Sequence, residues 1–117
     1  MRHHVQGKKF NRLQGPRRSF MRNLANDLIR SGKIETTEVR AKAIRPLVER
    51  CVTIARKKTL ASRRLLLARL QNKTTVAKLM DEIGGKYEGR AGGYLRITKL
   101  GKSRKRDGAP LATVEFV

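Results

Sequence analysis

The segment TEVRAKAIRPLVERCVTIARK, residues 37–57, decides the fold, because it carries the clearest helical pattern in the chain. At 100° per residue its apolar side chains fall on one face and most of its charged side chains on the other. Thr37 followed by Glu38 is typical of a helix N-cap with an acid at the positive end of the helix dipole. The sequence therefore predicts a helix over about 38–57. Its apolar face consists of Ala43, Ile44, Leu47, Val48, Cys51, Ile54 and Ala55.

Two residues of this predicted helix need separate interpretation. Pro46 lacks an N–H and clashes with the carbonyl of Lys42, so it should disturb the helix. Since the apolar period continues across Pro46, we expect a bend within one helix; two separate helices are the alternative. Cys51 lies in the apolar arc, which favours core packing. It is the only cysteine, which excludes an internal disulfide and a cysteine-based metal cluster.

A strand and a second helix are predicted before this segment. KIETT, residues 33–37, alternates as a brief strand does. Upstream, Ser19 suits a helix N-cap and Gly32 a C′ position, which predicts a helix between them. Its outward stripe would hold arginine and asparagine, which suit phosphate and base-edge contacts. The stripe consists of Arg22, Asn23, Asn26 and Arg30.

Two more helices and a hairpin are predicted after the segment. The hairpin loop GKSRKRDGA, residues 101–109, is basic, ends in an Asp-Gly turn signal and is too long for a tight turn. How the strands of the sheet pair cannot be derived from the sequence. The predicted elements are helices at about 60–71 and 73–83, the second ended by Gly84-Gly85, and strands at 94–100 and 111–116.

Charge is the strongest compositional signal. The 117 residues include 29 Lys and Arg against 9 Asp and Glu, a formal net charge of +20. Self-repulsion at that density opposes folding, and binding a polyanion would relieve it. We therefore expect a nucleic acid as partner, rather than an anionic membrane or an acidic protein. No apolar run reaches the ~18–20 residues of a membrane span, and no signal-peptide stretch opens the chain. We expect a soluble protein of the cytoplasm.

The first 18 residues form a basic region of their own, which we expect to be an extended N-terminal arm that becomes ordered on RNA. No carboxylate occurs before Asp27, and Gly7, Gly15 and Pro16 interrupt any helical pattern. The candidate RNA contacts of the arm are Arg2, His3, Lys8, Lys9, Asn11, Arg12, Arg17 and Arg18. Those of the hairpin loop are Lys102, Arg104, Lys105 and Arg106. Further candidates are Thr36, Thr37, Lys42, Arg64, Arg90, Tyr94 and Arg96.

Catalytic chemistry lacks the residues that it needs. His3 and His4 are the only histidines and have no carboxylate close by in the sequence, so neither zinc binding nor acid–base catalysis is expected. The glycine-rich stretch at 84–93 matches neither a Walker loop nor a dinucleotide fingerprint. We expect no enzyme activity, no cofactor and no small-molecule substrate.

Several ordered stretches resemble the bacterial family of large-subunit ribosomal protein number seventeen. These are MRH at the start, FNR at 10–12, FMRNLANDLI at 20–29, IETTEVRAKAIRPLVE at 34–49, RAGGYLRITKLG at 90–101 and the final ATVEFV. No single stretch is specific, but their order covers nearly the full length. Phe10 and Gly15-Pro16 depart from the family's usual arm, which leaves the path of the arm open.

The resemblance implies an α+β fold, with about four helices packed on a small three-stranded sheet, mixed or antiparallel. The predicted organisation is an arm at 1–18 and a single domain at 19–117. The resemblance also implies a structural constituent of the large ribosomal subunit that binds its ribosomal RNA near the peptide exit region and contacts neighbouring ribosomal proteins. A nucleoid-type or regulatory DNA-binding protein is the alternative, although no helix-turn-helix pattern stands out. An RNA-processing enzyme is a third hypothesis.

Overall fold

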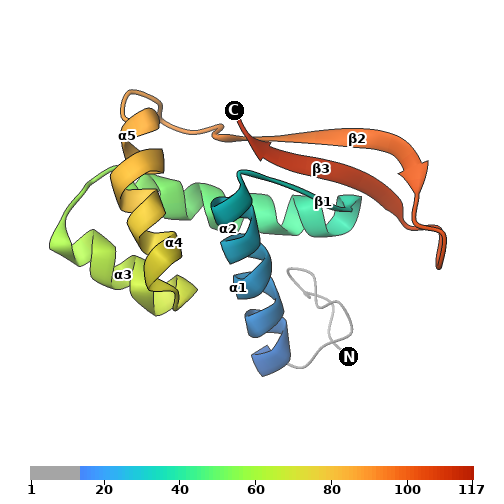
Figure 1. The fold of residues 1–117 in the computed structure, drawn as a ribbon, viewed down its shortest axis with the longest axis horizontal. Coiled ribbons are helices and arrows are strands. Elements are labelled where there is room, and N and C mark those ends of the chain that lie inside the picture. The colour runs from blue at the N-terminus through green and yellow to red at the C-terminus, as the bar shows by residue number, and fades with distance from the viewer. Residues whose placement is uncertain (1–13) are drawn as a thin grey trace, which may run out of the picture.

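A computed structural model of the chain describes residues 14–117, an α+β domain in which helices cover one side of a small sheet (Figure 1). This confirms the expected fold class. The elements are α1 (Gln14–Ser31), β1 (Lys33–Thr37), α2 (Glu38–Ala55), α3 (Leu60–Leu70), α4 (Lys73–Lys78), a π-helical turn η1 (Leu79–Ile83), α5 (Gly84–Lys86), β2 (Leu95–Ser103) and β3 (Pro110–Phe116). None of the helices within residues 14–117 is long and apolar enough to cross a bilayer.

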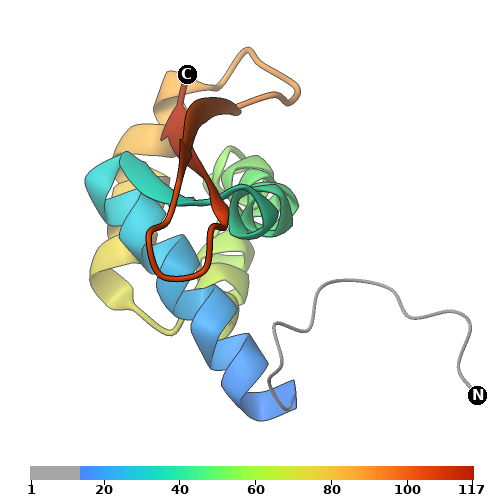
Figure 2. The ribbon, with the colours of Figure 1, turned by 90° about the vertical axis from the view of Figure 1, so that its right-hand side faces the viewer.

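The sheet is fully antiparallel, with strand order β1-β3-β2. Val114 of the central strand pairs with Ile34 on one side and Ile97 on the other. Val114 and Ala112 are fully buried in the same cluster as the inner face of α2. Seen from the side, α2 lies nearly end-on beside the sheet, while the start of α1 extends away from it (Figure 2). The sheet and α2 thus form the centre of the domain.

The predicted central helix is confirmed, including its start. Thr37 Oγ1 accepts a hydrogen bond from Arg40 N at 3.3 Å, the geometry of an N-cap. The helix is continuous through Pro46, whose ring is exposed to solvent, so the two-helix alternative is wrong. The helix ends at Ala55, two residues before the predicted boundary.

The first helix begins at Gln14, five residues before the predicted N-cap Ser19. Pro16 therefore lies in its first turn, where a missing N–H costs nothing because the first four N–H groups have no partner within a helix. The proline was thus misread as a helix breaker, and residues 14–18 of the predicted arm are helical. At the other end the prediction holds, because Gly32 has φ +81° and donates to Leu28 O at 2.7 Å.

The predicted helix stop at Gly84-Gly85 is wrong. The chain continues from α4 through the π turn into α5, so these glycines lie in helical backbone. Gly84 is buried, and a Cβ at this position would lie 3.0 Å from both Ala55 O and Leu79 O. The glycine allows the backbone of α5 to approach the end of α2, which is a packing role rather than a turn role.

The C-terminal hairpin is confirmed, with a longer first strand than predicted. Strand β2 runs to Ser103, with an irregular register between Lys99 and Ser103, so Lys102 belongs to the strand rather than the loop. Arg104 N donates to Ala109 O at 2.9 Å and closes the tip, and Gly108 has φ +70°. The hairpin tip, residues 104–109, projects from the domain on the side away from α3 (Figure 1).

Candidate nucleic-acid interface

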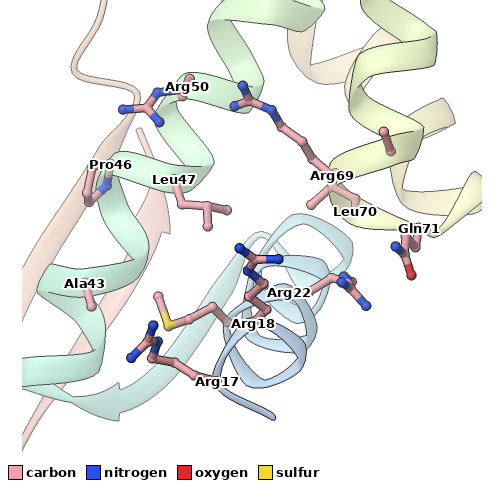
Figure 3. Close-up of a pocket in the computed structure, with 12 residues that line it drawn as sticks. Arg17, Arg18, Arg22, Ala43, Pro46, Leu47, Arg50, Arg69, Leu70 and Gln71 are labelled. Atoms are coloured by element: carbon pink, nitrogen blue, oxygen red, sulfur yellow. The ribbon is translucent and has the colours of Figure 1, made fainter. Parts of the chain in front are cut away.

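Arginines from three helices line one groove in the domain. The groove lies between α1, α2 and α3, has a volume of about 630 Å³, and has no carboxylate among its lining residues. Figure 3 shows side chains from the three helices converging around Leu47 and Leu70. The groove arginines are Arg17, Arg18, Arg22, Arg50 and Arg69.

The fold places these arginines close together although they are far apart in the sequence. Arg18 and Arg22 are one turn apart on α1, so they share a face. Arg50 comes from α2, and Arg69 from the last turn of α3, where a cation complements the helix dipole. Asn26 fixes α1 against the end of α3, because its Nδ2 donates to Leu70 O at 3.1 Å.

The groove arginines have no acidic partners among the described residues, and unlike other unpaired cations such as Lys105 and Arg106 they line one groove. Within residues 14–117, seven ion pairs engage seven different carboxylates, and none includes a groove arginine. Arg22 Nε is buried and has no hydrogen-bond partner in the structure. A buried donor without an acceptor is unfavourable, by about 1–3 kcal/mol. The groove is therefore a concentration of positive charge that is suited to an anion with several oxygen atoms.

The predicted outward stripe of α1 is only partly correct. Asn26 is buried, with 9% exposure, and its amide is used between helices, so the expectation that it faces a ligand is wrong. The reason is that α3 packs against the side of α1 that the pattern had left to solvent. Arg30 is exposed, but its Nη2 lies 2.6 Å from Asp27 Oδ1. Arg22 lines the groove and Asn23 is exposed.

Two other candidates are structural residues in the fold. Tyr94 is fully buried; its hydroxyl accepts from Arg56 Nη1 at 3.0 Å and donates to Arg90 O at 3.1 Å. It is therefore not available for stacking on a base, contrary to the prediction. Thr37 is buried as the N-cap of α2, and Thr36 is half-buried in β1.

The hairpin tip presents two exposed cations, Lys105 and Arg106, that form no ion pair within the described part of the chain. Arg104 instead pairs with Asp107, to which its Nε donates at 2.9 Å. The hydrogen bonds from Arg104 and from the Ala109 N–H lower the pKa of Asp107 to about 2. Lys102 Nζ lies 3.8 Å from Glu35 Oε1 on β1.

The remaining candidates do not gather with the groove. Lys42, Arg64, Arg90 and Arg96 are all exposed. Arg96 lies 3.9 Å from Glu115, and Arg90 Nε donates to Gly92 O. The arm candidates Arg2, His3, Lys8, Lys9, Asn11 and Arg12 lie outside the described residues.

Two of the groove arginines, Arg50 and Arg69, were not among the predicted site residues. Arg50 follows Ala43 and Leu47 at i+7 and i+3, and Arg69 stands beside Leu70, so each borders the apolar face of its own helix. An arginine at the edge of an apolar face could have indicated a groove between helices. Which helices would meet there could not be read from the sequence.

The buried thiol supports the interpretation of Cys51 as a core residue. Cys51 is fully buried, and burial raises the pKa of its thiol to about 11, although Arg69 and Arg50 act in the opposite direction. A thiol in this state is a poor nucleophile. In residues 14–117, no three His, Cys, Asp or Glu side chains are grouped so as to hold a metal ion.

Comparisons with known proteins agree on one family. The model of the family described as Ribosomal protein L17 matches residues 20–117. The large ribosomal subunit protein bL17 of Persephonella marina is 52% identical over 118 residues, which cover 100% of this chain and 95% of that protein. The proteins of the same name from Thermomicrobium roseum and Hydrogenobaculum sp. are 49% and 47% identical, each with 100% of this chain and 99% of the relative covered.

Proposed function

The chain belongs to the ribosomal protein L17 family, and on this basis we propose that it binds ribosomal RNA of the large subunit, chiefly through the arginine groove. It is a structural ribosomal protein and not an enzyme. The proposal places it in the bacterial cytoplasm on the ribosome, beside other large-subunit proteins.

The observation that carries the proposal is that five arginines, none of them with an acidic partner in the described part of the chain, line one groove. Elsewhere on the described surface, cations such as Arg45 and Arg63 are paired with Glu49 and Asp81, at 3.6 and 3.8 Å. Ion pairs of that kind need no external ligand. The groove arginines have no such compensation, and the guanidinium fork matches the geometry of a phosphate.

A second contact would come from the hairpin tip, where Lys105 and Arg106 are exposed. The tip projects away from α3, so the groove and the tip would contact separate RNA segments and hold them together (Figure 1). The arm, residues 1–13, would add a third contact. Of the predicted stripe on α1, Arg22 remains in this proposal as a groove residue and Arg30 as an exposed cation.

A salt titration with a matched control tests the proposal. Arg50→Gln combined with Arg69→Gln removes two groove charges from α2 and α3. If each arginine neutralises one phosphate, the slope of log K against log salt should become shallower by about 1.4 to 1.8. Arg45→Gln combined with Arg63→Gln removes two charges from the same helices outside the groove, and should change the slope much less.

The measurement uses the full chain and large-subunit ribosomal RNA at several salt concentrations. Equal slopes for both double variants would show that the groove is not the RNA site. Duplex DNA of comparable length, measured at the same salt, separates the alternative function. Tighter binding to the DNA than to the structured RNA would favour a DNA-binding protein.

A further inference from the structure

The floor of the arginine groove is apolar, which binding to phosphate alone does not explain. This floor, which is the apolar part of the lining, consists of Met21, Ala43, Pro46, Leu47, Ala68 and Leu70. A phosphate gains nothing from apolar surface, because losing its water there is costly. A nucleobase has two flat faces whose transfer out of water is favourable. An apolar floor with a rim formed by the groove arginines therefore suits a whole nucleotide.

The size of the groove agrees with that interpretation. Its volume of about 630 Å³ lies within the ~300–1,000 Å³ typical of sites that enclose a small organic molecule. No aromatic ring lines it, so the flat surfaces available for stacking are guanidinium planes. In Figure 3, the side chains of Arg18 and Arg22 extend from α1, and that of Arg69 from α3, into the space between the helices near Leu47 and Leu70.

A polar side chain at one end of the groove could read a base edge. Gln71 is the only lining residue whose side chain has both a donor and an acceptor. It is the left-handed C-cap of α3, with φ +52°, and its side chain is exposed. An amide in this position can make paired hydrogen bonds to an unpaired base.

We infer that the groove binds one unpaired nucleotide of the RNA, with the phosphate on the arginine rim and the base against Met21 and Leu47. The inference deepens the proposed function and rests on it. A groove of this kind would select RNA that has an unstacked nucleotide, such as a bulge, over a continuous helix. Recognition of sequence in RNA generally occurs at such unstacked positions.

The test compares two hairpin RNAs with equal numbers of phosphates, one carrying a single-nucleotide bulge and the other fully paired. The full chain should bind the bulged RNA more tightly by about 5-fold, the lower end of the range for stacking one base on an aromatic ring, since no such ring lines the groove. Met21→Gln replaces apolar floor by an amide of similar size and leaves the charge unchanged. It should abolish the preference, so that the two RNAs bind equally, while the salt slope stays as it was because no charge is removed.

A methyl signal gives a readout that is independent of affinity. With ¹³C-methyl methionine, the Met21 signal, identified by its loss in Met21→Gln, should move upfield when the bulged RNA is added, because a base ring lies over it. The paired RNA should not produce this shift. Ala43→Leu, which fills the groove without changing charge, is the second variant should Met21→Gln fold poorly, and should also remove the preference.

The outcomes separate the inference from the proposed function. If Arg50→Gln with Arg69→Gln leaves the binding of both RNAs unchanged, the groove is not an RNA site and both fail. If that variant weakens both complexes, but the wild type binds the two RNAs equally and the Met21 signal does not distinguish them, only the inference is overturned. Loss of the preference in Met21→Gln or Ala43→Leu supports it.

Discussion

Replacing Gly84 by alanine should destabilise the domain, although the same change at the next residue should not. The added methyl at position 84 would lie 3.0 Å from two backbone oxygens, those of Ala55 and Leu79. Neither oxygen can rotate away, because both belong to helical backbone. At Gly85 the nearest atom is the end of the Lys58 side chain at 3.5 Å, which can move. Both glycines lie in α5, so they form a matched pair.

The expected change in the free energy of unfolding follows from two opposing effects. Glycine to alanine in a helix is favourable by up to about 1 kcal/mol, and this gain applies to both variants. Overpacking against rigid backbone costs about 1–3 kcal/mol, and this loss applies only to position 84. The free energy of unfolding of Gly84→Ala should therefore be about 1–3 kcal/mol below that of Gly85→Ala. For a domain of this size, the melting temperatures should differ by at least about 4 °C.

Thermal unfolding followed by circular dichroism measures the difference, and urea unfolding gives the free energies. A Gly84→Ala variant that melts at or above Gly85→Ala would refute the reasoning, because it would show that α5 does not pack closely on the end of α2. An equal loss in both variants would also refute it, since it would indicate a general intolerance of side chains in this helix.

Three further expectations concern single side chains. Cys51 should not react with a thiol reagent at pH 8 in the native protein and should react on unfolding in urea, since burial raises its thiol pKa to about 11; fast native labelling would contradict this. The Asp107 carboxyl should titrate near pH 2 in a ¹³C NMR experiment, below its ordinary pKa of 3.8. Its ion pair with Arg104 should be fully present above pH 3.8 and should be lost as the pH falls through 2. Arg104→Gln should return the midpoint of the titration toward 3.8. Asn26→Ala should lower the free energy of unfolding by about 1 kcal/mol, because the Leu70 carbonyl loses its donor, and should leave the salt slope of RNA binding unchanged.

The sequence predicted those elements in which local pattern and burial agree. Residues 38–55 have one apolar face and an N-cap, so both the start of α2 and its inner side could be assigned. Gly32 marks the end of α1, because few other residues adopt a positive φ there without strain. The hairpin could be assigned from alternation and a turn signal, but the register irregularity near Ser103 has no local mark.

The errors arose where tertiary packing decides. Asn26 looks like a surface residue on a helical wheel, but α3 covers that side of α1 and supplies its hydrogen-bond acceptor. The buried hydroxyl of Tyr94 is held by Arg56 and by the carbonyl of Arg90. Arg56 is far from Tyr94 in the sequence, and no sequence pattern indicates the contact with Arg90. The groove was unpredictable for the same reason, since Arg50 and Arg69 meet only through the packing of two helices.

The π turn at Leu79–Ile83 has a consequence for how this part of the chain tolerates change in length. Such a turn accommodates one residue more than a regular helix would. The N–H of Gly84 bonds to Leu79 O, five residues back, across the turn. Deleting the exposed Glu82 would make this the four-residue bond of a regular helix, with Gly84 still beside Ala55 and Tyr87 still in the core. The wide turn thus absorbs one residue without rotating the segment that follows it, so the chain should accept a deletion at this position as well as substitutions.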